Sequence, residues 1–160
     1  MNIVDRTAAA VLIDKVSAAD VPVIFFNRQP VQEDIRRWEQ VYYVGPKGEQ
    51  SGIYQGEILL EEWNGNRASA DRNADGVLQY VMLEGEPGHQ DALLRSEYAT
   101  KPLTDAGVPL EKLASDTANW SRAQAAARMK QWCREFGAGV EAVIANNDDM
   151  ALGAIDAMKE

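Results

Sequence analysis

The sequence predicts an α/β fold, in which a mostly parallel sheet is flanked by helices. The main observation is that short apolar runs alternate with longer segments of helical periodicity, which is the pattern of βαβ units. The second observation is length, because 160 residues are enough to bury a real core. No internal repeat or low-complexity tract interrupts the alternation.

The first quarter of the chain holds two predicted strands. A helix is expected over residues 8–16, and the apolar run over residues 21–26 predicts a buried strand. A short polar helical piece follows, and then a second strand over residues 41–44. The Gly45-Pro46-Lys47-Gly48 stretch is the best candidate for a boundary between two lobes.

The remaining three quarters continue the alternation. A helix is predicted where Ile53, Gly56, Leu60 and Trp63 share one face. Ser121 and Gln124 have the spacing of a capping box in front of an Ala-rich helix. The other predicted elements are a strand over residues 77–84, a helix from near Gly88, a weaker strand over residues 113–117, a strand over residues 140–145 and a closing helix over residues 148–158.

Composition excludes several classes of protein. The net charge of −9 argues against binding to nucleic acid or to anionic membrane surfaces. No apolar run approaches transmembrane length, and the first residues lack the apolar stretch of a signal peptide, so we expect no export signal in this chain itself. The single cysteine, Cys133, excludes an internal disulfide and is interpreted as a small buried hydrophobe on a helical stripe.

Residues 71–79 contain most of a calcium-binding loop. Aspartate and asparagine at alternate positions place hard oxygen ligands on one side of a tight turn, and a glycine supplies that turn. The expected ligands are Asp71, Asn73, Asp75, the Val77 carbonyl and Gln79, with Gly76 at the turn. The alternative interpretation is an Asx-rich surface turn that binds no metal.

The loop departs from an EF-hand at its twelfth position. That position is Met82, inside an apolar run, so a strand follows the loop where an EF-hand would have a helix. The bidentate carboxylate must therefore come from another part of the chain. We expect it at the start of another strand, which leaves Glu111 and Glu141 as candidates. A metal there would lie at the amino end of the sheet, away from the ligand.

Polar residues follow each predicted strand, at the edge where open α/β sheets bind their ligands. The set holds Asn27, Arg28, His89, Asp91, Arg95, Asn119, Trp120, Asn146 and Asn147. Its amides, carboxylate, guanidinium and flat aromatic ring suit a neutral polyol with an apolar ring face. Each residue also has an ordinary structural interpretation: Asp91 and Arg95 as a surface ion pair, Trp120 as core, His89 as a neighbour of a helix cap, and Asn27 or Asn147 as turn residues.

At these residues the chain resembles the periplasmic glucose/galactose-binding proteins, the substrate-binding components of sugar ABC transporters, which also serve chemotaxis. The resemblance rests on the calcium-type loop and on residues 21–27 (VPVIFFN), 42–45 (YYVG), 85–91 (GEPGHQD), 116–120 (DTANW) and 144–148 (IANND). It implies a periplasmic-binding-protein type I-like fold of two α/β lobes that close on the sugar by a hinge.

The resemblance also implies the functional residues. The sugar would be held by Asn27, His89, Asp91, Arg95, Trp120 and Asn147. A structural Ca²⁺ would be held by Asp71, Asn73, Asp75, the Val77 carbonyl, Gln79 and, as the bidentate ligand, Glu141. Implied partners are a monosaccharide, an ABC transporter permease and a chemoreceptor, and the implied location of the full-length parent is periplasmic.

The resemblance covers only the middle of a family member. Residues 1–45 are similar to the end of the first lobe and residues 46–160 to most of the second, so we expect a segment of a longer protein. Pro102 falls where the family continues a helix, which should kink or stop near Lys101. Because the sheets would be incomplete, we expect marginal stability and self-association through exposed strand edges.

Binding of a hexose such as glucose or galactose in a cleft between the lobes is the leading functional interpretation. One alternative is a carbohydrate-active enzyme, such as a glycosidase with paired carboxylates, but Asp91 is the only evident acid on the ligand edge. The other alternative is a sugar-sensing transcriptional regulator of the same fold, which would need a DNA-binding element upstream of Met1.

Overall fold

The computed structural model describes residues 1–159 and divides the chain into two compact units. Unit 1 is Met1–Lys47, and unit 2 begins at Gly48. The division therefore follows Lys47, whereas the predicted first lobe ends at residue 45. No helix within residues 1–159 has the length and apolarity needed to cross a lipid bilayer.

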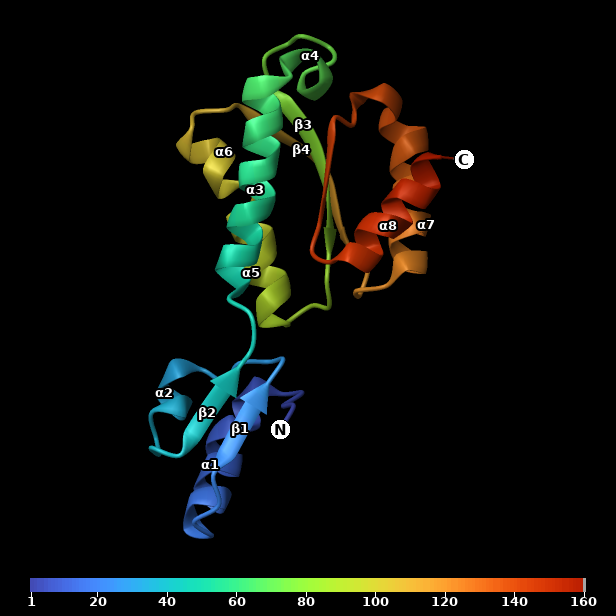
Figure 1. Ribbon diagram of the computed structural model, residues 1–160. Helices are drawn as coiled ribbons and strands as arrows, with labels where there is room; N and C mark the ends of the chain where they lie inside the picture. The colour runs from blue at the N-terminus through green and yellow to red at the C-terminus, as the bar shows by residue number, and fades with distance from the viewer. Residues whose placement is uncertain (160) are drawn as a thin grey trace. The chain divides into compact units, whose positions relative to one another are not determined.

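Unit 1 is a small parallel ribbon with helices. Its elements are η1 (Arg6–Ala8), α1 (Ala9–Ala18), β1 (Val23–Phe26), α2 (Gln32–Ile35) and β2 (Val41–Val44), labelled in Figure 1 where there is room. β1 pairs parallel to β2 with Val23 opposite Val41. The two predicted strands and their parallel pairing are thus confirmed.

The burial of β1 differs from the prediction. Val23 and Phe25 pack with Ile13 of α1 in the buried cluster of unit 1. Ile24 and Phe26, however, are 54% and 50% exposed. The strand is therefore buried on one face only, because within unit 1 the buried cluster covers a single face of a two-stranded sheet.

Unit 2 is a three-stranded parallel sheet with helices on both faces. Its elements are α3 (Gly48–Gly65), α4 (Arg67–Ala70), β3 (Leu78–Glu84), α5 (Gln90–Ala99), α6 (Lys101–Asp105), β4 (Leu110–Thr117), α7 (Arg122–Phe136), η2 (Gly137–Gly139), β5 (Ala142–Ala145) and α8 (Asp148–Met158). The strand order is β4-β3-β5, and both pairings are parallel, which confirms the predicted fold class.

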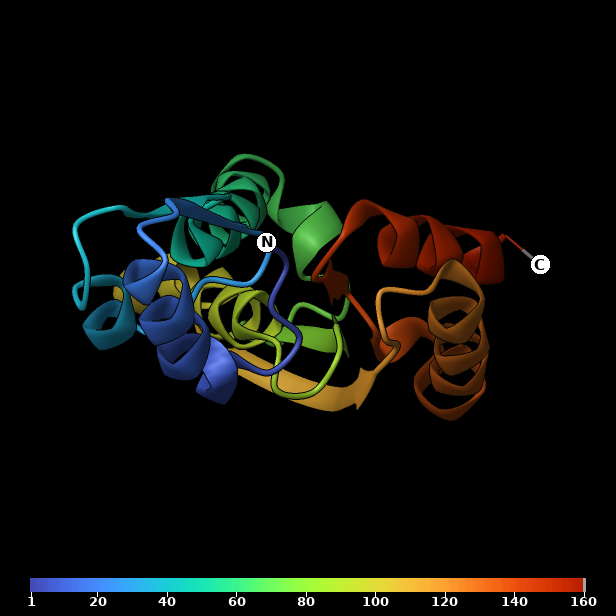
Figure 2. The same cartoon turned by 90° about the horizontal axis from the view of Figure 1, so that it is seen from below.

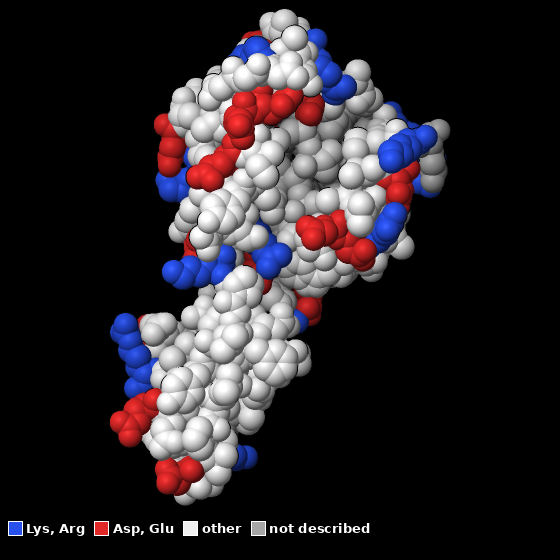
Figure 3. Space-filling model, viewed as in Figure 1, with Lys and Arg blue, Asp and Glu red and all other residues white. Residues whose placement is uncertain are grey.

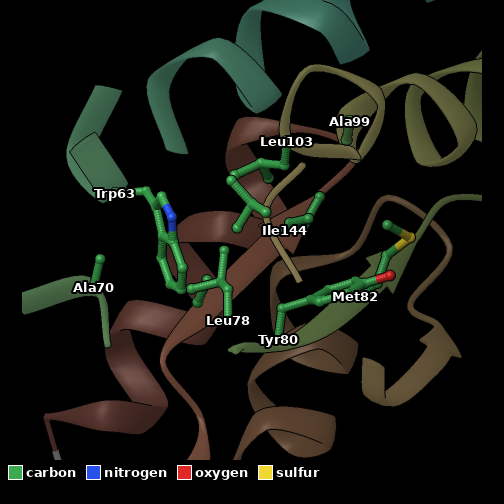
Figure 4. Packing of buried hydrophobic residues seen from close by; sticks show 10 residues of the cluster. Trp63, Ala70, Leu78, Tyr80, Met82, Ala99, Leu103 and Ile144 are labelled. Carbon is green, nitrogen blue, oxygen red and sulfur yellow. The ribbon is translucent and has the colours of Figure 1, made fainter. Parts of the chain in front are cut away.

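The central strand β3 is buried from Leu78 to Leu83. Its alternate side chains enter two separate cores, because successive residues of a strand point to opposite faces. Leu78, Tyr80 and Met82 pack with Trp63, Leu103 and Ile144 (Figure 4). Val81 and Leu83 pack with helices α7 and α8 on the other face. Figures 1 and 2 show α3 and α5 on one side of β3 and α7 and α8 on the other.

Two local predictions can be compared with the structure. β4 begins at Leu110 and not at Leu113, and its register with β3 shifts between Tyr80 and Val81. α5 ends at Ala99 and α6 begins at Lys101 with proline in its first turn, which confirms the predicted helix break.

The predicted capping box is present only in part. The Ser121 side chain caps α7 by accepting a hydrogen bond from the Gln124 backbone. The reciprocal bond of a capping box is absent in the described hydrogen bonds, because the Gln124 side chain accepts from Asn119 instead.

Candidate functional site

Five of the six residues predicted to bind sugar meet at the carboxyl edge of the sheet in unit 2. Two belong to α5 and one caps it, since His89 is the N-cap and Asp91 and Arg95 lie in its first two turns. Trp120 lies in the turn between β4 and α7, and Asn147 caps α8 directly after β5. Parallel strands bring their carboxyl ends to one edge, which is why residues so far apart in sequence come together.

Asp91 and Arg95 form the charged centre of this group. Arg95 Nη2 lies 3.1 Å from Asp91 Oδ2, and both side chains are largely buried. Arg95 Nη1 donates to the Asn146 carbonyl at 2.8 Å. Arg95 Nε is buried and makes no hydrogen bond within residues 1–159. The guanidinium is therefore fixed in position by two polar partners, while its Nε is a buried donor without an acceptor among the described residues.

The Trp120 ring is held over the end of β3. A Cβ atom added to Gly85 would lie 2.3 Å from two atoms of this ring, so only glycine allows the contact. The His89 ring meets the indole edge-on, with the two ring centroids 5.1 Å apart. Arg95 Cζ lies 5.9 Å from the centroid of the Trp120 ring. The backbone of Trp120 has φ 62°, a left-handed conformation that is uncommon for a bulky residue.

Two of the five residues, His89 and Asn147, also make hydrogen bonds that stabilise the local backbone. The His89 ring accepts a hydrogen bond from the Asp91 backbone at 3.2 Å. Asn147 Oδ1 accepts from the Met150 backbone at 3.0 Å, and its Nδ2 donates to the Trp120 carbonyl at 3.3 Å. The structural roles predicted as alternatives for these residues are therefore present, and the Asn147 bond helps to hold Trp120 in its strained turn.

The sixth residue, Asn27, belongs to unit 1. It follows β1 with φ 67°, and its carbonyl accepts a hydrogen bond from the Tyr43 hydroxyl at 3.2 Å. Its amide donates to Asn2 Oδ1 at 3.4 Å. Asn27 is thus a turn residue at the carboxyl end of its own sheet. Asn27 thus belongs to unit 1, whereas the other five residues belong to unit 2.

Asn146 has a larger role than the sequence indicates. It is fully buried, and its Oδ1 accepts from the Gly85 backbone at 2.9 Å while its Nδ2 donates to Ser96 at 3.0 Å. Asn146 therefore ties the end of β3 to the end of β5 and to α5. In the sequence, the Asn146-Asn147 doublet after an apolar strand indicates a polar site at that strand end, but it does not indicate which of the two side-chain amides points inward.

A hollow of about 260 Å³ opens beside this network, along β5. Its lining includes Ser51 and Gln55 of α3, together with Arg95, Asn147 and Asp148. Two further hollows continue along β5 and share Val143 with it. Figure 3 shows the depression between the two groups of helices of unit 2. Within residues 1–159, the edge of β5 that faces away from β3 is therefore accessible and pairs with no further strand.

The calcium-type loop lies at the opposite, amino end of β3. Asp75 Oδ2 accepts from Asn73 Nδ2 at 3.0 Å, and Gln79 Oε1 lies 3.4 Å from the same nitrogen. The Val77 amide, which donates to Asp75 at 2.8 Å, holds the pKa of that carboxyl below its ordinary value. Oxygens of two predicted ligands thus lie within hydrogen-bond distance of the same amide NH2 group, and carboxylate and amide oxygens are the ligand types that suit a hard cation.

Glu141 is the acid that closes this loop. Its two oxygens accept from the Arg72 backbone at 2.6 Å and from the Gln79 backbone at 3.2 Å. Among the described hydrogen bonds, Glu111 accepts only from the Gln79 side chain, at 3.4 Å. Among residues 1–159, no three acidic, histidine or cysteine side chains converge closely enough to hold a metal by themselves. The predicted ligand set therefore also depends on its amide and backbone oxygens.

Comparisons with known proteins give one consistent family. The model of the periplasmic binding protein domain matches residues 1–160. A D-galactose/methyl-galactoside binding periplasmic protein of Haemophilus influenzae is 41% identical over 160 residues, which cover 99% of this chain and 48% of that relative. The chain thus spans about half the length of the curated relatives that it matches along its whole length.

Solved structures agree with the fold. A solute-binding protein of Bacillus halodurans with bound myo-inositol is 32% identical, with a TM-score of 0.74, and the match covers 99% of this chain and 49% of that one. A Mycobacterium smegmatis protein in complex with β-D-fucofuranose superposes with a TM-score of 0.77 at 23% identity, over 99% of this chain and 48% of that one. At that identity the second match supports the fold alone.

Removal of the Asn146 amide should disrupt this edge. Asn146→Ala leaves the buried Gly85 amide without its acceptor, so we expect a loss of about 2–3 kcal/mol in the free energy of unfolding. Asn147→Ala, which removes an N-cap, should cost about 1 kcal/mol. Urea denaturation monitored by circular dichroism measures both. Equal stabilities for the two variants would contradict the central role of Asn146.

Proposed function

The chain belongs to the periplasmic binding protein family, and on that premise we propose that it binds a hexose such as glucose or galactose for import by an ABC transporter. The observation that carries this proposal is the connected group of His89, Asp91, Arg95, Trp120 and Asn147 at one sheet edge. The proposal extends to the permease as partner, to a chemoreceptor, and to a periplasmic location for the parent protein.

The group has the chemistry that a pyranose requires. The Asp91 carboxylate accepts hydrogen bonds from hydroxyls, and the Arg95 guanidinium donates to ring or hydroxyl oxygens. The Trp120 ring offers a flat apolar surface to the C–H face of the sugar. Asn147 has one amide hydrogen beyond the one that it donates to Trp120. Asn27 is included in this set because the resemblance to the family implies it.

A binding role is proposed in preference to a catalytic or regulatory one. The relatives found in the comparisons carry names of binding proteins, including one that binds galactosides and one that binds xylitol. Asp91 is held by Arg95 as a hydrogen-bond acceptor, which suits recognition of hydroxyls. A sugar-sensing regulator would have the same fold, and the acidic net charge of −9 does not favour nucleic acid as its partner.

We further propose a structural Ca²⁺ in the loop before β3, held by Asp71, Asn73, Asp75, the Val77 carbonyl, Gln79 and Glu141. The support is the placement of Glu141 against the loop and the convergence of oxygens from Asp75 and Gln79. Such a metal would link the loop to the start of β5 and would not touch the sugar.

Calcium should stabilise the chain. A ligand held only by the folded state adds about 2.7 kcal/mol at a hundredfold excess over Kd. Asp75→Ala and Glu141→Gln should each remove most of this effect, whereas Glu111→Gln should keep it. Thermal melts in calcium and in chelator make the comparison. Equal melting temperatures of the unmodified chain in both conditions would end the calcium proposal.

Sugar binding should be saturable but weak. Unit 2 supplies a single stacking aromatic, Trp120, and a sugar covered on one face gains only part of the available contact energy. We expect a Kd for glucose or galactose of about 1 mM, equivalent to about −4 kcal/mol. Trp120→Ala and Asp91→Ala should abolish the binding, and Lys101→Ala on α6 should leave it unchanged.

Calorimetric titration at high protein concentration measures this affinity. Nanomolar binding by the monomer would contradict the expected weakness. Complete absence of saturable binding in the folded chain would contradict the sugar site itself.

We also propose that the chain associates with itself through its apolar sheet surface in unit 1. Ile24, Phe26, Tyr42 and Val44 on β1 and β2 are all at least half exposed. An apolar sheet surface of this kind favours association.

Sedimentation velocity over a range of concentrations tests the association. Phe26→Asp should shift the chain toward monomer, whereas Val11→Asp, at a 58% exposed position of α1, should not. A chain that stays monomeric at every concentration would contradict self-association.

A further inference from the structure

Arg67 contacts the first predicted ligand of the calcium-type loop. It begins the short helix α4, directly before that loop. Its Nε and Nη2 lie 3.0 and 2.9 Å from Asp71 Oδ2. On its other side, its Cζ lies 3.4 Å from the centroid of the buried Trp63 ring. The guanidinium is therefore held between an aromatic face and a carboxylate.

The Asp71 carboxylate is almost enclosed, since its side chain is 5% exposed. Oδ2 accepts from Arg67 and also from the Gly76 backbone at 3.1 Å. Within residues 1–159, Oδ1 accepts only from the Asp75 backbone, at 3.1 Å. A buried carboxylate is stable only when its charge is balanced, and Arg67 supplies that balance within the loop.

The other charged groups near the loop do not play this role. The Arg72 guanidinium donates to the carbonyls of Ala138 and Val140. Asp75 and Glu141 bring the formal charge of the predicted carboxylate ligands to about −3, and Arg67 reduces the local total to about −2. The charge of the ligand set is one of the factors that fix the calcium affinity of such loops.

We propose that Arg67 is an internal counter-cation of this loop: it stabilises the metal-free form and lowers the affinity for calcium. This inference rests on the proposed calcium site. Its distinctive consequence is that removal of the charge has effects of opposite sign, because the same cation that balances Asp71 repels an incoming divalent ion.

Arg67→Gln removes the charge and keeps a polar side chain of similar shape. In chelator its melting temperature should fall by about 2–4 °C, the change that corresponds to about 1 kcal/mol for a chain of this size. Its calcium Kd, measured by competition with a chelating dye, should become about tenfold tighter. Arg67→Lys, which keeps the charge, should bind calcium like the unmodified chain.

Lys101→Gln is the matched control. It removes another i,i+4 ion pair of unit 2, the contact of Lys101 with Asp105 at 2.7 Å, and should change neither quantity. A lower stability together with a weaker calcium affinity in Arg67→Gln would overturn the proposal, since Arg67 would then merely orient Asp71. Unchanged affinity in Arg67→Gln would also overturn it. No calcium binding by the unmodified chain would overturn the calcium site, and this inference with it.

Discussion

The burial of β3 on both faces is the constraint on which the rest of unit 2 depends. Six successive residues of this strand, Leu78 to Leu83, are buried, and its apolar side chains divide between two cores, with Leu78, Tyr80 and Met82 in one and Val81 and Leu83 in the other. A strand in that position cannot slip by one residue without exchanging its two faces. Its two ends are thereby fixed in space. The loop that contains Asp71, together with Glu141, is held at the amino end, and the polar residues around Arg95 and Trp120 are held at the carboxyl end. The seven residues of β3, at about 3.3 Å each, separate the two ends by about 23 Å.

Backbone strain at the carboxyl end is concentrated at the residues proposed to bind sugar. Asn119 and Trp120 both have positive φ, at 50° and 62°. Such conformations persist only when the surroundings determine them. Here the Ser121 cap fixes the start of α7, the Asn147 amide holds the Trp120 carbonyl, and the absence of a side chain on Gly85 leaves room for the indole. A ring fixed in this way loses little freedom when a sugar packs on it, which is the advantage of a preorganised site.

The sequence predicts the strands, their parallel order and the polar edge because these follow from periodicity and chain direction. The break at Pro102 was equally predictable, since proline removes a backbone donor and displaces its neighbour from helical geometry. What escaped prediction depends on tertiary contact. The exposure of Ile24 and Phe26 reflects which face of the unit 1 sheet is covered, and the inward turn of Asn146 reflects a contact with Gly85 across the sheet. Arg67 resembles any surface arginine until its contact with Asp71 is seen.

The most direct test of the central claim, that β3 carries two separate sites at its two ends, is the backbone amide NMR spectrum recorded during titration with calcium and, separately, with galactose. We expect two disjoint groups of shifted amides. Calcium should move residues 71–79 and Glu141, and galactose should move residues 85–95 together with Trp120 and Asn147. Galactose shifts confined to the loop before β3, or no shift at the carboxyl edge at saturating sugar, would contradict it.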